Sequence, residues 1–181
     1  TWAAMAITEP GCGSDSAAIR TTATKDGDDY ILNGEKIFVT SGERADSVVV
    51  WASLDKKLGR AAIKSFVVPK GTVGMKVERL EHKLGIKASD TAVISFIDCR
   101  VPAANLLGNP EVDVAEGFAG VMETFDNTRP LVAAMAVGCA KASLERIKEI
   151  FKDQLDPDYK TPYLQTSNLA TQIYRMEAEW E

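Results

Sequence analysis

The chain changes its sequence pattern near Pro110, and this change does most to limit the folds open to it. Before Pro110, short runs of β-branched and aromatic residues are separated by turn sequences such as KDGDD, NGE, SGE and PKGTVG. Short strands in series, without helices between them, are typical of an antiparallel sandwich or barrel. After Pro110 the sequence is rich in alanine and has helical periodicity. We therefore predict an α+β protein, with an antiparallel β-barrel or sandwich of about seven or eight strands over residues 1–110 and α-helices over residues 111–181.

One turn signal stands out in the β-half, the Asn33-Gly34 pair within YILNGEKIFVT. This dipeptide favours the two positive φ angles of a tight two-residue turn, so the sequence predicts a hairpin there. The predicted strands are Trp2–Thr8, Tyr30–Asn33, Lys36–Thr40, Ser47–Leu54, Ala62–Pro69, Lys76–Leu80 and Ala92–Asp98.

The helical half contains two apolar stripes with the spacing of helix faces. Thr128 is suited to cap a helix and Pro130 to its first turn, so we expect the first helix to begin there. The second stripe still runs at the end of the chain, and the chain opens directly before a strand, so we expect an internal piece of a longer protein. The stripes are Ala140, Leu144, Ile147, Phe151 and Leu155, then Leu169, Ile173, Met176 and Trp180.

The composition excludes several classes of function. With 26 acidic and 21 basic residues the net charge is −5, which argues against nucleic acid or an anionic membrane as a partner. No apolar run approaches the roughly 20 residues of a membrane span, and no signal peptide is expected. Cys12, Cys99 and Cys139 lie far apart and His82 is the single histidine, so no metal site is expected. Unpaired thiols suit the cytoplasm, and His82, among charged residues, is expected at the surface.

Three stretches carry residues suited to binding. In AMAITEPGCGSDSAAIRT a strand enters a turn whose glycines allow close backbone approach, and amides around Gly13, Ser14 and Asp15 suit an anion; a purely structural turn is the alternative. NGEKIFVTSG alone is a hairpin arm. In FDNTRPLVAAMAVG, helix capping accounts for Asp126 and Thr128, and Arg129 is either a phosphate or carboxylate partner or a capping ion pair.

Taken together and in order, these stretches with LGIKASDT and DCRVPAANLLG resemble the acyl-CoA dehydrogenase family, from about Trp2 to Phe151. The chain is similar to the family's middle β-domain followed by the first helices of its C-terminal domain, which is of the four-helix-bundle type. The resemblance implies FAD as cofactor and an acyl-CoA thioester as substrate. The implied cofactor-binding residues are Met5, Ile7, Thr8, Gly13, Ser14, Phe38, Val39 and Thr40. The implied substrate-binding residues are Ser14, Phe125, Asp126, Thr128 and Arg129.

The activity implied by the resemblance is α,β-dehydrogenation of the acyl-CoA in fatty acid β-oxidation. In the family a glutamate removes the α-proton while the β-hydrogen passes as hydride to flavin N5. The base of such relatives lies further along the chain than Glu181, so no catalytic residue is assigned here. The implied partners are an electron-transfer flavoprotein and further subunits of a homo- or heterotetramer. An acyl-CoA oxidase that uses O₂ and a non-catalytic scaffold or regulatory subunit are the alternatives.

Several residues depart from the family's pattern. Cys12 replaces a smaller residue, and Phe38 replaces a frequent tryptophan while keeping an aromatic side chain beside the flavin. The segment FKDQLDPDYKTPYLQTS lacks the arginine and Phe-Gly pair through which many relatives reach FAD, and Lys160 would supply only a point charge. Of the glutamates present, Glu9 is expected to stabilise its turn and Glu43 to be solvated.

Overall fold

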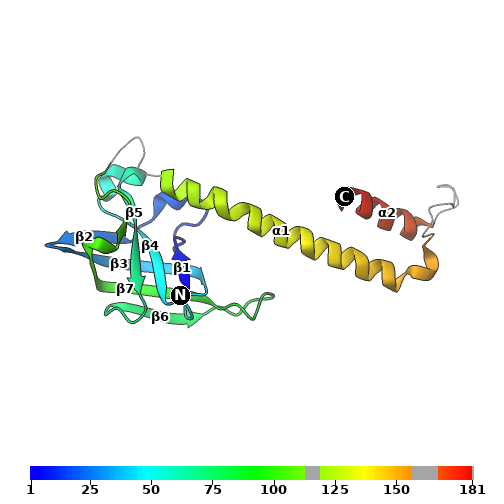
Figure 1. Cartoon of the computed structure of the whole chain (residues 1–181), viewed down its shortest axis with the longest axis horizontal. Helices are drawn as coiled ribbons and strands as arrows, with labels where there is room; N and C mark the ends of the chain where they lie inside the picture. The colour runs from blue at the N-terminus through cyan, green and yellow to red at the C-terminus, as the bar shows by residue number, and fades with distance from the viewer. Residues whose placement is uncertain (113–118, 156–166, 181) are drawn as a thin grey trace. The chain divides into compact units, whose positions relative to one another are not determined.

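The computed structural model describes residues 1–112, 119–155 and 167–180. It divides into two compact units, Thr1–Gly120 and Val121–Glu181, each of which is described by itself below. The first unit contains the strands and the second the helices α1 and α2 (Figure 1).

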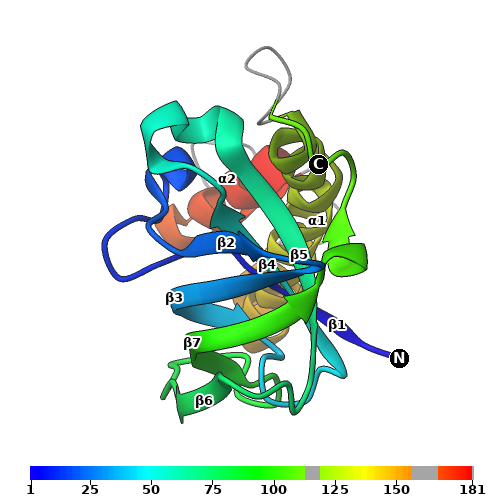
Figure 2. The ribbon, with the colours of Figure 1, turned by 90° about the vertical axis from the view of Figure 1, so that its left-hand side faces the viewer.

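The first unit is an eight-stranded, mostly antiparallel sheet with the order β6-β7-β3-β2-β4-β5-β8, and β1 pairs with β4. Figure 2 shows β2, β3, β7 and β6 as successive neighbours. Two pairings are parallel, the full β1–β4 ladder and the single Thr22–Ser53 pair between β2 and β4. The strands are β1 (Ala3–Ala6), β2 (Thr22–Asp26), β3 (Asp29–Thr40), β4 (Ser47–Ser53), β5 (Ile63–Pro69), β6 (Met75–Leu80), β7 (Thr91–Pro102) and β8 (Leu106–Leu107).

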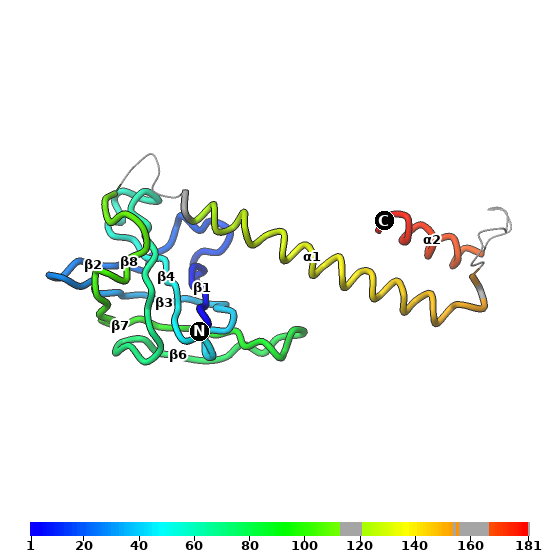
Figure 3. Tube along the Cα trace, viewed as in Figure 1, coloured from blue at the N-terminus to red at the C-terminus, as the bar shows by residue number. Residues whose placement is uncertain are grey.

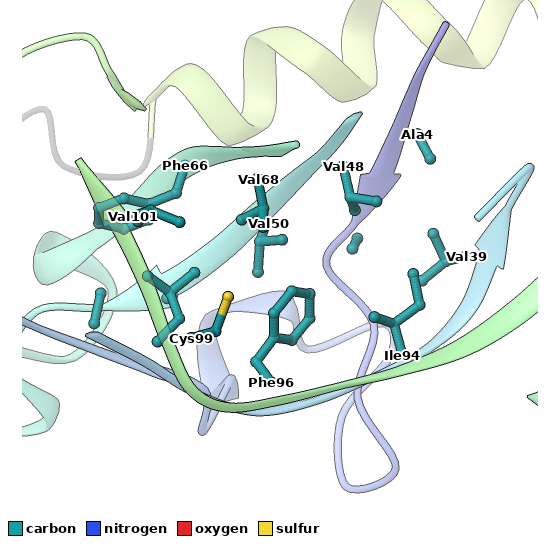
Figure 4. Close-up of a cluster of buried hydrophobic side chains, with 14 of the residues drawn as sticks. Ala4, Val39, Val48, Val50, Phe66, Val68, Ile94, Phe96, Cys99 and Val101 are labelled. Carbon is teal, nitrogen blue, oxygen red and sulfur yellow. The ribbon is translucent and has the colours of Figure 1, made fainter. Parts of the chain in front are cut away.

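Alternating apolar side chains build the core of this unit. Figure 4 shows Val48 and Val50 of β4 and Phe66 and Val68 of β5 pointing toward Phe96 of β7 and its neighbours. All of these side chains are almost completely removed from solvent. Burial at this level contributes roughly 1.5–3 kcal/mol for each large apolar side chain. The predicted α+β class with an antiparallel β-domain is thereby confirmed.

The hairpin predicted at Asn33-Gly34 is wrong, because β3 runs without interruption through both residues. The actual hairpin joins β2 to β3 through Gly27, which has a φ of +62°. At Asn33 the irregularity lies in the partner strand, where β7 holds one extra residue opposite Leu32–Gly34. The Asn33 side chain pairs there with Asp98, its Oδ1 accepting from the Asp98 amide at 2.9 Å. The Asn-Gly pair therefore marks a bulge between two long strands instead of a turn.

The second unit consists of α1 (Ala119–Ile150) and α2 (Asn168–Trp180), which lie side by side in Figures 1 and 3. The expected start at Thr128 is wrong, since α1 continues through that residue and through Pro130. The Thr128 hydroxyl caps nothing and instead donates to the carbonyl oxygens of Thr124 (3.0 Å) and Phe125 (3.2 Å). Back-bonding of this kind satisfies a threonine inside a helix, so the residue no longer marks a helix end.

Parts of the two predicted stripes face each other. Ala140, Leu144 and Ile147 of α1 line one apolar groove together with Met176 and Trp180 of α2. An ion pair between Lys148 and Glu177, at 2.5 Å, joins the helices beside this groove. The α1 stripe thus finds at least one of its partners in the same chain.

Candidate cofactor site

A tight turn follows β1 and begins the first predicted binding segment. The amide of Glu9 donates to the carbonyl of Cys12 at 2.9 Å, and the amide of Cys12 donates back to the carbonyl of Glu9 at 3.1 Å. Proline suits the second position of such a turn, where Pro10 stands. Beyond the turn Gly13 and Ser14 are exposed, and among the described residues their amides donate to no other part of the chain.

A buried ion pair lies beneath this turn. The Lys36 ammonium is 0% exposed and lies 2.7 Å from Oε1 of Glu9, whose side chain is 6% exposed. The ammonium also donates to the carbonyl of Ile7 at 3.1 Å. Glu9 accepts further bonds from the amide of Arg20 (2.6 Å) and from the amide (2.9 Å) and hydroxyl (2.6 Å) of Thr21. Glu9 therefore holds its turn, as the sequence predicted, and also joins it to β3.

The electrostatics of the pair follow from burial and from these hydrogen bonds. Burial raises the pKa of Glu9, but the hydrogen bonds from Lys36 and Thr21 and the charge of Lys36 outweigh burial, so the pKa lies below its ordinary value. Burial lowers the pKa of Lys36, and the hydrogen bond and charge of Glu9 oppose that effect. Each group thus favours the ionised form of the other.

A bulge in β3 decides which way the second predicted binding segment faces. Inward side chains alternate regularly as far as Lys36, but the pairing with β7 shifts between Lys36 and Val39. Phe38 occupies the extra position with a φ of +57°, which is unfavourable for a bulky side chain. As a result Phe38 (60% exposed) and Thr40 face outward, and Val39 points into the core.

The turn after Thr40 is fixed by Asp90, the residue directly before β7. The amide of Ser41 donates to the carbonyl of Asp90 at 2.9 Å, and the amide of Glu43 donates to its carboxylate Oδ2 at 2.9 Å. The other carboxylate oxygen of Asp90 lies 3.5 Å from Nε of Arg44. Glu43 itself is exposed, as expected, and so is His82.

The structure brings two of the three predicted segments together. The amide of Ile37 donates to the carbonyl of Thr8 at 2.9 Å, which places the end of β3 beside the segment after β1. Met5 is partly exposed and Thr8 half-buried, whereas the side chains of Ile7 and Val39 are buried. Any contact that Ile7 or Val39 makes with a cofactor would therefore involve its main chain.

The donor set of these two segments fits a flavin nucleotide. In the described parts of the chain, none of the hydroxyls of Thr8, Ser14 and Thr40 is hydrogen-bonded to another protein group. They lie on the same two segments as the exposed ring of Phe38 and the free amides of Gly13 and Ser14. Hydroxyls suit the polar edge of an isoalloxazine, an aromatic ring suits its flat face, and loop amides suit a diphosphate.

The third predicted segment lies on α1, in the second unit. The Arg129 guanidinium is 3.1 Å from Oδ1 of Asp126 and lies over the ring of Phe125, 5.7 Å from its centroid. Thr128 is half-buried, while Asp126 and Arg129 are exposed. These side chains form one local cluster, with its charged groups open to solvent. Lys160 and most of the altered segment lie outside the described residues.

Sequence reasoning missed Lys36, Thr21 and Asp90. A signal for Lys36 was present, because it continues the inward series Tyr30, Leu32 and Gly34 of one strand. A lysine at such a position requires a buried acceptor. Neither Thr21 nor Asp90 carries a comparable signal, since their partners lie far away in the sequence.

Within residues 1–112, 119–155 and 167–180, no three His, Cys, Asp or Glu side chains are grouped so as to hold a metal ion. In the same part of the chain, neither helix combines the length and the apolar character that crossing a membrane requires.

Comparisons with known proteins relate this chain to one protein family. The family model of the acyl-CoA dehydrogenase middle domain matches residues 4–99. The mitochondrial short-chain specific acyl-CoA dehydrogenase of Rattus norvegicus is 44% identical over 141 residues, which are 78% of this chain and 33% of that protein. The chain thus spans about a third of the length of that relative.

Solved structures superpose over almost the whole chain. Butyryl-CoA dehydrogenase from Megasphaera elsdenii gives a TM-score of 0.85 at 36% identity, over 98% of this chain and 45% of that one. A chain in the structure of the electron transferring flavoprotein of Acidaminococcus fermentans gives 0.80 at 40% identity, over 97% and 46%. With the matched middle domain and the fold in agreement, the chain belongs to the acyl-CoA dehydrogenase family.

Proposed function

We propose that this chain forms the flavin-binding middle part of an FAD-dependent acyl-CoA dehydrogenase, which converts an acyl-CoA thioester to the trans-2-enoyl-CoA. The observation that carries the proposal is the pairing of two segments, joined by the Ile37–Thr8 hydrogen bond, that present unbonded hydroxyls and an outward aromatic ring. Membership of the family supports the same conclusion.

The residues of this chain bind and orient the cofactor. The hydroxyls of Thr8 and Thr40 hydrogen-bond the polar atoms of the isoalloxazine, and Phe38 covers part of one ring face. The amides of Gly13 and Ser14 hold the diphosphate. When bound, FAD supplies the hydride-accepting redox chemistry. No residue of this chain is proposed as the base that removes the α-proton.

The acyl-CoA is proposed to use the cluster of Phe125, Asp126, Thr128 and Arg129 on α1. Arg129 and Asp126 are exposed and carry opposite charges, which suits them to a phosphate and to an amide donor of the coenzyme respectively. Thr128 and Phe125 lie three residues apart on the same helix. Ser14, in the β unit, is proposed separately as a substrate-binding residue. Relatives named for short-chain and butyryl-CoA substrates make butyryl-CoA the first thioester to test.

The proposed electron acceptor is an electron-transfer flavoprotein, which the similarity to a chain in the Acidaminococcus fermentans structure supports. A homo- or heterotetramer and a location in the cytoplasm are proposed with it. The three free cysteines support a reducing compartment.

The test is a visible absorption spectrum of the full-length protein, before and after anaerobic addition of butyryl-CoA and then of longer and branched acyl-CoAs. We expect flavin bands that bleach with at least one thioester and return when electron-transfer flavoprotein is added. Bleaching that reverses under air with formation of peroxide would indicate the oxidase. A full-length protein that neither carries nor takes up FAD contradicts the proposal and favours a non-catalytic subunit.

A further inference from the structure

We propose that Glu9 and Lys36 are positioning residues for the cofactor, because their buried ion pair sets the position of Thr8 relative to Phe38 and Thr40. This inference rests on the proposed function. It adds two buried residues that would not contact the cofactor themselves. It assigns to the pair a role in binding geometry beyond the stability of the fold.

Lys36 connects the two binding segments through its buried side chain. Its ammonium donates to the carbonyl of Ile7, the residue before Thr8, and to the carboxylate of Glu9, the residue after Thr8. Lys36 itself stands two residues before Phe38 on β3. One side chain therefore holds Thr8 from both sides and fixes it to the strand that carries Phe38.

Glu9 extends this connection to the segment before β2 by accepting hydrogen bonds from it. Besides Lys36, its carboxylate accepts two main-chain amides and one hydroxyl from Arg20 and Thr21, directly before β2. A carboxylate with four donors around it has a single favourable position. The turn after β1 is therefore located against both β2 and β3.

Stability alone does not account for such a pair. Two apolar side chains of similar volume often stabilise a fold as well as a buried ion pair does, because the charges lose their hydration. An ion pair differs from apolar packing in that its geometry is directional and resists sliding. Directional support is needed here, because the bulge at Phe38 begins directly after Lys36 and holds a residue with a φ of +57°.

The test compares three variants of the full-length protein with the wild type. Glu9→Gln with Lys36→Met removes both charges, so that neither remains buried without a partner, and Lys36→Met alone breaks the pair. Val101→Ala is the matched control, because Val101 lies in the same sheet, is completely buried and pairs with Tyr30, away from the binding segments. The readouts are the Kd for FAD from flavin fluorescence, the visible circular dichroism of the bound flavin, and the Tm of the FAD-free protein.

We expect the double variant to bind FAD about tenfold or more weakly, as supporting residues behind a metal site do when they are replaced. Its bound flavin should also show an altered visible circular dichroism. The loss of affinity and the spectral change should both be larger than those in Val101→Ala, even though Val101→Ala lowers the Tm by as much or more. Lys36→Met alone should show the same changes in FAD binding and a lower Tm than the double variant, because it leaves the Glu9 carboxylate buried without Lys36.

Wild-type affinity and an unchanged flavin spectrum in the double variant would overturn the inference, and so would losses no larger than those of Val101→Ala at equal Tm. In either case the proposed function stands, because the wild type binds FAD. A wild-type protein that takes up no FAD would overturn the proposed function, and this inference with it.

Discussion

The main-chain amide of Ile37 donates a 2.9 Å hydrogen bond to the main-chain carbonyl of Thr8. Neither β1 nor β3 includes Thr8, so this bond joins a strand to a loop and adds nothing to a regular ladder. Its effect is to hold Thr8 beside the end of β3, the strand that carries Phe38 and Thr40.

Replacing Thr8 or Thr40 by valine removes a hydroxyl that has no partner within the described chain. We expect little change in stability, and a loss of about 1 kcal/mol in FAD binding for each hydrogen bond removed, or roughly fivefold in Kd. Thr24→Val, at an exposed position of β2, is the control and should leave FAD binding unchanged. Fluorescence titration with FAD checks the prediction, which fails if all three variants bind alike.

Phe38→Gly removes both an aromatic ring and a strained backbone conformation. Because Phe38 has a φ of +57° and a side chain that is 60% exposed, the FAD-free protein should keep its free energy of unfolding or gain up to about 1 kcal/mol. FAD should bind more weakly, since one ring face loses its cover. Denaturant unfolding and FAD titration measure the two effects.

Ile97→Gly is the matched control for Phe38→Gly. Ile97 is 67% exposed on β7 and lacks a positive φ, so glycine there should cost about 0.5–1 kcal/mol. Equal losses of stability in both variants would show that Phe38 is not strained.

Gly34→Ala should destabilise the β unit. A Cβ at Gly34 would lie 2.4 Å from the hydroxyl oxygen of Thr21, which donates to Glu9. Thr21 would have to move, and overpacking of this kind costs about 1–3 kcal/mol. Gly85→Ala, where nothing lies within 4 Å, should be neutral. Denaturant unfolding that finds both variants equally stable would contradict the packing described around Glu9.

The Glu9–Lys36 pair should make stability depend on pH in the acid range. The pKa of Glu9 is lowered in the folded protein from its ordinary 4.5, so its contribution is present above about pH 4.5 and is lost as the pH falls toward the folded pKa. We expect the Tm difference between wild type and Glu9→Gln to be largest near neutral pH and to shrink below pH 4.5. A constant difference from pH 7 to pH 3 would show that the Glu9 charge contributes nothing.

Local patterns predicted much of the fold. The valine run of β4 and the alternation in β5 and β7 follow directly from hydrophobic periodicity. Errors arose where tertiary structure overrode a strong local signal. Asn33-Gly34 has the composition of a turn, but Gly34 pairs with Phe96 of β7 and the Asn33 side chain bonds Asp98, so the strand stays extended. Thr128 is a residue type that often caps helices, but α1 begins earlier and continues through it.

The candidate site was less accessible to sequence reasoning than the fold. The order of the segments identified the family. The cofactor-binding roles that the resemblance implies for Thr8, Ser14, Phe38 and Thr40 stay predictions. Periodicity alone would have placed Phe38 inside and Val39 outside, because nothing in IFVT announces an extra residue in the pairing. The contact between Lys36 and Glu9 joins distant parts of the chain, and such pairs follow only from the folded structure.

Because of the bulge in β3, the number of residues in the strand decides, as much as their type, which side chains face solvent. Removing one residue between Lys36 and Val39 would restore simple alternation, and Lys36 and Val39 would still point into the core while Thr40 still faced outward. Keeping every residue but losing the bulge would instead shift the register with β7 by one residue, so that Phe38 and Thr40 turned into the core and Val39 faced outward. An alignment of this segment with a relative is therefore informative only where any difference in length is placed at the bulge, because a one-residue error there assigns the opposite facing to every residue that follows.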